Sequence, residues 1–283
     1  MIKNLKQMRL VMDIIILSKQ SAFLKEKRGG TIRITAQFYI DHEVNIPYDL
    51  NYPLSSYIYQ CIGLANAELG DWLHNEGLAY RGKSYKPLVF SRLHFERRRN
   101  KSTHMEVKGL CGLTIDSIQP EIIQHLIQGM WKKGYLQLLD VKIPLMDVKM
   151  KAAHSFVETM SYKLLSPVVV PVQIDKGLHF CHPLESQFYD SLRQSISNWY
   201  NLKWQEELPR EVSIQISLLQ PEFFQLKKAA VLTQYKEKKV KGYLASIQVQ
   251  APPKVQQVIY ESGLGSYNSQ GFGCVEVIQE EKK

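Results

Sequence analysis

The chain has 283 residues, enough for one large domain or two of ordinary size, and 45% of them are hydrophobic, which excludes a disordered protein. Its formal net charge of +9 favours a polyanionic partner, nucleic acid ahead of a membrane surface. The cysteines are scattered without a C-x-x-C pair, so we expect no disulfide framework and no zinc site, and a reducing cytoplasm fits best. They are Cys61, Cys111, Cys181 and Cys274.

The first thirty residues predict an appendage to the folded part of the chain. Basic residues precede a short apolar run at 10–17, which Asp13 interrupts, and no small-residue cleavage site follows. This run is too short for a membrane span and poor as a signal peptide. We therefore expect residues 1–30 to form an N-terminal extension, and we expect no membrane partner.

From Thr31 the pattern becomes regular. Apolar residues alternate with polar ones over 32–40, the period of a half-buried strand. The expected elements that follow are a helix opened by Asn51 and Pro53, a second helix at 67–75 ended by Gly77, a hairpin of strands at 88–97 and 106–116 whose turn carries residues 98–101, a helix opened by Pro120, and a strand at 135–143. This β-α-β-β-α-β order is the signature of a ferredoxin-like domain.

The second half repeats this plan. Its expected elements are strands at 154–165 and 168–174, a helix with apolar residues three or four apart from Leu184 to Trp199, strands at 212–218 and 243–249, a helix at 252–262 and a last strand at 274–278. The predicted fold class is α+β. We expect two tandem ferredoxin-like domains, at 31–146 and 150–283, with a glycine-rich loop near the C-terminus.

That loop contains two G-x-G pairs, Gly263 with Gly265 and Gly271 with Gly273. Glycine lets backbone N–H groups turn toward a phosphate. A dinucleotide fingerprint must follow a strand and open a helix, but here a helix precedes the loop and a strand follows it, which argues against a nicotinamide or flavin site. Taken alone, the glycines fit a turn that only places the last strand at least as well as a phosphate site.

Residues that can do chemistry concentrate between 57 and 86. We find no nucleophile elbow and no P-loop, and the one dense run of potential metal ligands, at 179–182, is typical of a strand end and loop. We therefore expect no metal and no cofactor. Tyr59 points away from the apolar face of its helix, His74 projects away from the buried side of the next helix, and Lys86 ends a basic loop.

A phenol, an imidazole and an amine near one loop suit RNA cleavage by transesterification. A base and an acid handle the 2′-hydroxyl and the leaving 5′-oxygen, and a cation stabilises the charged phosphorane. The alternative is ordinary: outward-facing histidines on helices are usually solvated, and tyrosines and lysines are common near loops.

Taken together, these residues resemble one family, the CRISPR repeat-processing endoribonucleases, the sixth Cas family of the repeat-associated RNA-binding superfamily. The resemblance covers about 31–278 and is most specific at the glycine loop, 263–275. Supporting matches lie at 59–62, 73–77, 86–91 and 165–168. The family carries two ferredoxin-like folds and a metal-independent catalytic triad.

By this resemblance Tyr59, His74 and Lys86 take the places of the catalytic triad. His74 would act as general acid or base, Tyr59 would position or help deprotonate the 2′-hydroxyl, and Lys86 would stabilise the developing charge. Lys83 competes with Lys86, because the loop after His74 is longer than in some relatives.

Basic residues that can grip RNA phosphates form two groups, and a solvated surface role is the alternative for each member. The first group is Arg92, Arg97, Arg98 and Arg99, with His94 and Lys101, and the second is Lys227, Lys228, Lys236, Lys238, Lys239 and Lys241 around a predicted hairpin. By resemblance, Gly263, Gly265, Gly271 and Gly273 also belong to the RNA-binding set.

We therefore expect a cytoplasmic, metal-independent endoribonuclease that cuts CRISPR precursor RNA within its repeats to yield guide RNAs. One rival is an RNA-binding subunit of a CRISPR ribonucleoprotein that does not cut. Another is a ferredoxin-like protein acting through small molecules or protein contacts, against which the basic charge weighs. The sequence leaves open the repeat recognised, whether the protein forms a homodimer, and whether it stays in an interference complex.

Overall fold

A computed structural model describes residues 32–175 and 177–278, so the predicted extension at 1–30 lies outside the described residues. The described residues belong to one compact unit. In them no helix is long and apolar enough to cross a membrane. All four cysteines are free thiols, and all four are buried.

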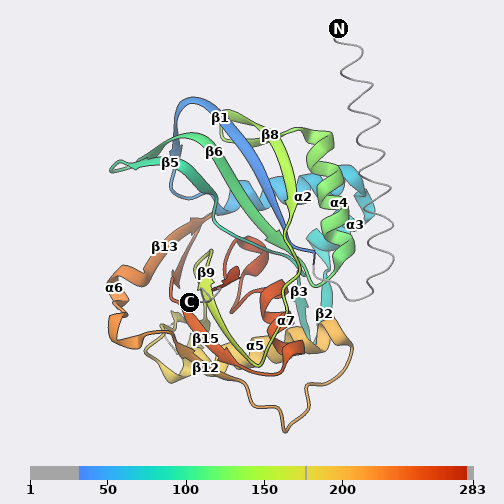
Figure 1. Cartoon of the computed structure of the whole chain (residues 1–283), viewed down its shortest axis with the longest axis vertical. Coiled ribbons are helices and arrows are strands. Elements are labelled where there is room, and N and C mark those ends of the chain that lie inside the picture. The colour runs from blue at the N-terminus through green and yellow to red at the C-terminus, as the bar shows by residue number, and fades with distance from the viewer. Residues whose placement is uncertain (1–31, 176, 279–283) are drawn as a thin grey trace. The chain divides into compact units, whose positions relative to one another are not determined.

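The first half of this unit is an antiparallel sheet with helices on one face (Figure 1). Its elements are β1 (Ile34–Pro47), α2 (Asn51–Ala65), α3 (Ala67–Asn75), β2 (Leu78–Tyr80), β3 (Lys83–Tyr85), β4 (Val89–Phe90), β5 (His94–Asn100), β6 (His104–Asp116), α4 (Pro120–Lys133), β7 (Tyr135–Leu138) and β8 (Val141–Met150). The sheet order is β4-β6-β1-β8-β7, with β5 also paired to β6, while β2 and β3 form a separate hairpin.

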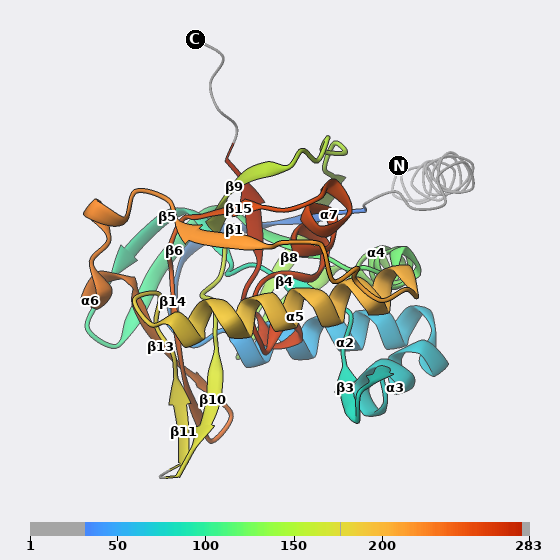
Figure 2. The ribbon, with the colours of Figure 1, turned by 90° about the horizontal axis from the view of Figure 1, so that it is seen from below.

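The second half has a second antiparallel sheet, ordered β12-β15-β9-β16. Its elements are β9 (Thr159–Leu164), β10 (Pro171–Ile174), β11 (Gly177–Phe180), α5 (Ser186–Trp204), β12 (Gln215–Leu218), a 3-10 turn at Pro221–Phe223, α6 (Leu226–Ala229), β13 (Ala230–Tyr235), β14 (Lys238–Tyr243), β15 (Ile247–Gln250), α7 (Pro253–Ser262), a 3-10 turn at Asn268–Gln270 and β16 (Val275–Val277). Two hairpins, β10–β11 and β13–β14, stand apart from that sheet (Figure 2).

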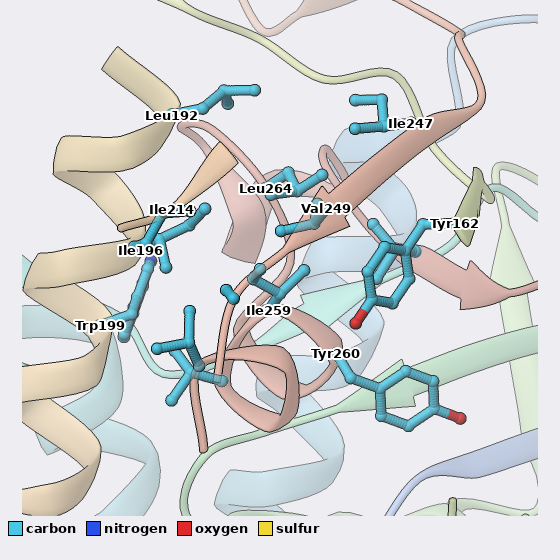
Figure 3. Close-up of a cluster of buried hydrophobic side chains, with 14 of the residues drawn as sticks. Tyr162, Leu192, Ile196, Trp199, Ile214, Ile247, Val249, Ile259, Tyr260 and Leu264 are labelled. Atoms are coloured by element: carbon cyan, nitrogen blue, oxygen red, sulfur yellow. The ribbon is translucent and has the colours of Figure 1, made fainter. Parts of the chain in front are cut away.

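Helical periodicity builds the core of the second half. Leu192, Ile196 and Trp199 lie on one face of α5, and they point toward Val249 of β15 and Ile259 of α7 (Figure 3). All five side chains are buried. Each such burial contributes about 1.5–3 kcal/mol, so packing of this face fixes α5 and α7 against the sheet.

Most predicted elements are confirmed, and α3 has the bounds 67–75 that its pattern predicts. The predicted turn at 98–101 is wrong, because β5 stays paired with β6 through Asn100. The strand predicted at 135–143 is two strands, since Leu139 takes a left-handed φ of +51° where the chain reverses.

The strand predicted at 243–249 is also wrong as one element. Its first residue ends β14, which pairs with β13, whereas its last residues belong to β15 in the main sheet. The strand predicted at 154–165 begins only at Thr159, and Leu184 lies before α5 with its side chain 62% exposed. The 168–174 segment pairs as a strand from Pro171 onward, with β11, which the sequence analysis did not expect.

One buried arginine joins the two halves. The Arg33 guanidinium donates to Asp116 Oδ2 over 2.8 Å, and its other nitrogens donate to the backbone carbonyls of Val275 and Tyr260. It also lies 3.4 Å from the centroid of the Tyr260 ring. Because Arg33 and Asp116 come from the first half and their partners from the second, this cluster ties β1 and β6 to α7 and β16.

Replacing Arg33 with methionine should lower the free energy of unfolding by about 3–5 kcal/mol, because Asp116 then remains as an uncompensated buried charge. Denaturant titration measures this. Arg193→Met, which breaks the exposed pair with Asp190, is the matched control and should change stability by about 1 kcal/mol or less. Equal losses in the two variants would contradict a structural role for the buried pair.

Candidate active site

Tyr59, His74 and Lys86 line a single pocket of about 650 Å³. It lies between α2, α3 and the tip of the β13–β14 hairpin, and its other lining residues are Tyr52, Ser55, Ser56, Gln60, Gly63, Ala67, Gly70, Asp71, Tyr235, Lys236, Ser269 and Gln270. We call it the α2–α3 pocket. The three side chains named from sequence are therefore brought together, although they come from separate elements.

The tyrosine and the histidine meet edge to face. The ring centroids of Tyr59 and His74 are 5.7 Å apart, with an interplanar angle of 87°. The neighbouring Tyr57 is buried in the core, as the helical face predicts, whereas His74 is exposed at the pocket. Burial raises the pKa of Tyr59 to about 12, although a hydrogen bond with Ser269 opposes the shift. The phenol is therefore protonated near neutral pH and can donate a hydrogen bond.

The amine of Lys86 is buried without a hydrogen-bond partner among the described residues. Burial lowers the pKa of Lys86, against the opposing charge of Glu76. Lys83, its competitor in the sequence analysis, lies exposed in the β2–β3 hairpin and does not line the α2–α3 pocket.

Two glycines let α3 approach α2 closely. A Cβ added to Gly70 would lie 2.8 Å from the Cα of Gly63, whereas one added to Gly63 would meet nothing within 4 Å. Both glycines line the pocket. Gly63 lies on the same helix as Tyr59 and Gly70 on the same helix as His74, so the close contact joins the two helices that carry these side chains.

The glycine loop is mostly buried and packs by its backbone. A Cβ on Gly265 would lie 2.5 Å from the Val169 carbonyl oxygen, and one on Gly273 would lie 1.9 Å from the carbonyl oxygen of Leu264. The N–H groups of Gly263, Gly271 and Gly273 donate to carbonyls of the protein itself. Contact of these glycines with RNA remains a prediction, and their described role is close packing.

The tip of the same loop supplies part of the pocket. Asn51 at the start of α2 donates its side-chain amide to the carbonyls of Gln270 and Gly271, over 2.8 and 3.0 Å. The Ser55 hydroxyl donates to the Ser269 carbonyl over 3.1 Å. Three consecutive residues of the loop, Ser269, Gln270 and Gly271, are thereby fixed beside the helix that carries Tyr59.

The predicted RNA-binding arginines divide between two surfaces. Arg92 and Arg98 line a cavity of about 720 Å³ that also takes Lys163 from the second half. Arg97 and Arg99 are exposed on β5 but do not line it, and Arg99 lies 3.4 Å from a Glu106 oxygen. We call this cavity the arginine groove.

The two hairpin lysines lie beside the active-site candidate. Lys238 and Lys239 line a cavity of about 680 Å³, the lysine pocket, which shares Tyr235, Lys236 and Gln270 with the α2–α3 pocket. Lys236 lies over the Tyr52 ring, 5.0 Å from its centroid. A cationic surface of the second half thus continues into the pocket of the first.

Two family models match consecutive parts of the chain. The model of CRISPR-associated protein Cas6, N-terminal, matches residues 45–149, and that of CRISPR associated protein Cas6, C-terminal, matches residues 149–277. The chain belongs to the Cas6 family.

Curated relatives and a solved structure agree with the Cas6 assignment. CRISPR-associated endoribonuclease Cas6 of Pyrococcus furiosus is 24% identical over 240 residues, covering 84% of this chain and 85% of the relative. CRISPR-associated endoribonuclease Cas6 1 of Methanocaldococcus jannaschii is 24% identical over 258 residues, covering 89% and 95%. The structure described as a Cas6-related gene from Pyrococcus furiosus shares the fold, with a TM-score of 0.75 and 23% identity over 89% of this chain and all of that one.

Sequence reasoning missed the pocket residues that this Cas6 chain takes from its second half. Lys236 was in the second basic cluster, but no pattern connected it to the helix of Tyr59. Ser269 and Gln270 lie between the glycine pairs, and only their contacts with Asn51 and Ser55 show where they belong. Spacing along the chain carries no signal for contacts across more than 160 residues.

Gly63→Ala and Gly70→Ala form a matched pair. Alanine normally stabilises a helix relative to glycine by about 0.5–1 kcal/mol, so Gly63→Ala should raise the free energy of unfolding by up to that amount. Gly70→Ala should lower it by about 1–3 kcal/mol, because its Cβ meets backbone that must move. Denaturant titration of both variants decides the point, and equal stabilisation would show that α3 does not need this close approach.

Proposed function

We propose that this Cas6-family chain is an endoribonuclease that cuts CRISPR precursor RNA within its repeats to generate guide RNAs, in the α2–α3 pocket. The observation that carries the proposal is the meeting of Tyr59, His74 and Lys86 in that one pocket. Its context supports this, since the relatives similar over most of the chain are named CRISPR-associated endoribonucleases.

The chemistry we assign to the pocket is attack by a 2′-hydroxyl on the adjacent phosphorus. The O2′–P bond forms, the P–O5′ bond breaks, and one proton leaves the 2′-oxygen while another reaches the 5′-oxygen. The products are a 5′-hydroxyl fragment and one ending in a 2′,3′-cyclic phosphate, which can open to a 3′ phosphate. No step needs a metal ion, so the reaction we propose is metal-independent.

Each side chain has a role that its surroundings support. The exposed imidazole of His74 can accept a proton from one reacting oxygen or donate one to the other. The Tyr59 phenol, with its pKa of about 12, positions the 2′-hydroxyl by hydrogen bonding rather than removing its proton. The unpartnered Lys86 amine stabilises the negative charge that grows on the phosphorane oxygens.

We also propose that each half is a ferredoxin-like domain, divided near residues 146–150. Across the first sheet β5, β6, β1 and β8 lie side by side, and across the second β12, β15, β9 and β16 lie side by side. Each therefore has its second, third, first and fourth strands as neighbours, with a helix after the first strand and another after the third. This repeated order is what a β-α-β-β-α-β unit requires.

The RNA path we propose follows the cationic surfaces. The lysine pocket with Lys238 and Lys239 adjoins the α2–α3 pocket, so it suits the phosphates next to the cut. The arginine groove, with Arg92 and Arg98, suits a more distant part of the repeat. Assembly into an interference complex, homodimer formation and a cytoplasmic location stay predictions.

Cleavage should require the 2′-hydroxyl and His74 but no divalent ion. In excess EDTA the protein should cut its cognate repeat RNA and leave intact the same RNA with a deoxy sugar just upstream of the cut, as gel analysis of the products shows. His74→Ala should lower the rate about 10²–10⁴-fold and leave RNA affinity unchanged. Binding without cleavage by the wild-type chain would instead indicate a non-catalytic RNA-binding subunit.

The pH dependence of cleavage should reveal Lys86. Because burial lowers the pKa of Lys86, its positive charge is lost as pH rises through a value below the ordinary 10.5, and the rate should fall there. Lys86→Arg should remove that alkaline decline, since a guanidinium keeps its charge. Lys83→Arg is the control and should leave the profile unchanged; a decline that follows Lys83 instead would transfer the role to that residue. Uncatalysed RNA hydrolysis is subtracted at each pH.

A further inference from the structure

Three potential metal ligands meet where β11 runs into α5. One ligand atom from each of His179, Cys181 and Glu185 lies within 4.8 Å of the other two. His179 and Cys181 are two residues apart at the end of the strand, and Glu185 is the residue before the first turn of α5. Sequence reasoning considered only the run 179–182 and expected no metal there, because nothing marked Glu185 as its neighbour.

The existing contacts hold these groups in place. His179 Nε2 is 2.9 Å from Glu185 Oε1, and Glu185 Oε2 accepts the backbone N–H of His182 over 2.6 Å. The Cys181 side chain is buried, with its sulfur 3.9 Å from Gln187 Oε1. The strand end and the helix start therefore present a nitrogen, a sulfur and an oxygen to one point.

This donor set matches zinc. Zinc sites use imidazole nitrogen, thiolate sulfur and carboxylate oxygen in a tetrahedron, and bond lengths of about 2.0–2.3 Å place the ligand atoms roughly 3.3–3.8 Å apart. The three atoms here need shifts of about an ångström to reach that spacing, which side-chain rotation provides. Magnesium and calcium prefer all-oxygen sites, so the thiol argues against them.

His182 does not complete the set. Its Nδ1 accepts the backbone N–H of Leu184 over 3.2 Å, so in a neutral ring the proton sits on Nε2, the nitrogen that is 3.9 Å from Glu185 Oε1. A metal at Nε2 would move that proton to Nδ1 and break the bond to Leu184. The fourth position is therefore left for water.

We propose that His179, Cys181 and Glu185 bind one Zn²⁺ ion that fastens the β10–β11 hairpin to the start of α5. On binding, the proton between His179 Nε2 and Glu185 Oε1 moves to Nδ1 of the ring and the direct contact between the two side chains is replaced by bonds to zinc. The Cys181 thiol loses its proton to solvent and the sulfur–zinc bond forms. The hairpin supplies Leu178 and Phe180 to the lysine pocket, so the ion would stabilise one wall of that pocket. None of the three ligands lines the α2–α3 pocket, so the ion takes no part in the cleavage chemistry that we propose there.

Cobalt titration of the metal-free protein tests the site directly. Co²⁺ at a thiolate gives a charge-transfer band in the near ultraviolet, together with visible ligand-field bands, and we expect both to saturate at one equivalent. Zn²⁺ should displace the cobalt and abolish the bands. Cys181→Ser should lose the charge-transfer band, whereas Cys111→Ser, which removes a buried thiol outside the cluster, should keep it.

A second measurement covers a Cys181 variant that fails to fold. Zn²⁺ at a hundredfold excess over its dissociation constant should raise the melting temperature of the wild-type protein by about 5–10 °C. Glu185→Gln should weaken zinc affinity at least tenfold while the protein stays folded. Bands that persist in Cys181→Ser, or zinc affinity unchanged in Glu185→Gln, would overturn the proposal.

The test for zinc binding and the test for RNA cleavage can fail separately. EDTA should lower the melting temperature of the zinc-loaded full chain. Cleavage of repeat RNA at 25 °C should continue, because none of the three zinc ligands lines the α2–α3 pocket. If His74→Ala loses cleavage but binds cobalt normally, the zinc proposal is unaffected. If the wild-type protein cuts repeat RNA but gives no cobalt bands, the zinc proposal fails and the proposed nuclease function is unaffected.

Discussion

The rest of the structure depends on the buried guanidinium of Arg33. A buried charge is tolerated only when its hydrogen bonds are satisfied, and Arg33 finds them partly in its own half, at Asp116, and partly in the other, at two carbonyls. Neither half alone can satisfy the whole group. The two sheets are therefore held together by an energetic requirement as well as by apolar packing.

Within that frame, desolvation acts on the candidate site in two ways. It favours the neutral form of both Tyr59 and Lys86. For the phenol this is useful at once, because a neutral phenol can donate to an oxygen. For the Lys86 amine, burial destabilises the charged form, so a negative charge placed beside the amine stabilises that form strongly. The transition state of phosphodiester cleavage carries more negative charge on the phosphate oxygens than the ground state does. In the mechanism that we propose, both groups would therefore favour the transition state over the ground state before RNA binds.

Helical periodicity made part of this site predictable. The apolar faces of α2 and α3 predict that Tyr59 and His74 point away from the core. His74 is exposed, whereas Tyr59 is half-buried in the pocket. Lys86 has no such periodicity, and its assignment came from the family resemblance together with its place before a strand. The three residue types suggested RNA cleavage by themselves, and the resemblance assigned each of them a place in the catalytic triad.

The remaining features depend on contacts that a one-dimensional pattern does not contain. A left-handed Leu139 has no distinguishing neighbours, so the reversal between β7 and β8 was missed. The glycine loop fitted two interpretations equally, and only the carbonyls packed against Gly265 and Gly273 show the close approaches that require glycine. Glu185 likewise joins His179 through a turn whose direction no motif records.

The hydrogen bonds from Asn51 to Gln270 and Gly271 join residues that are 219 and 220 positions apart in the sequence. The wall of the α2–α3 pocket beside Tyr59 is therefore formed only where the two halves of the described unit dock. A substitution that loosens this docking would reshape the pocket while leaving Tyr59, His74 and Lys86 themselves unchanged.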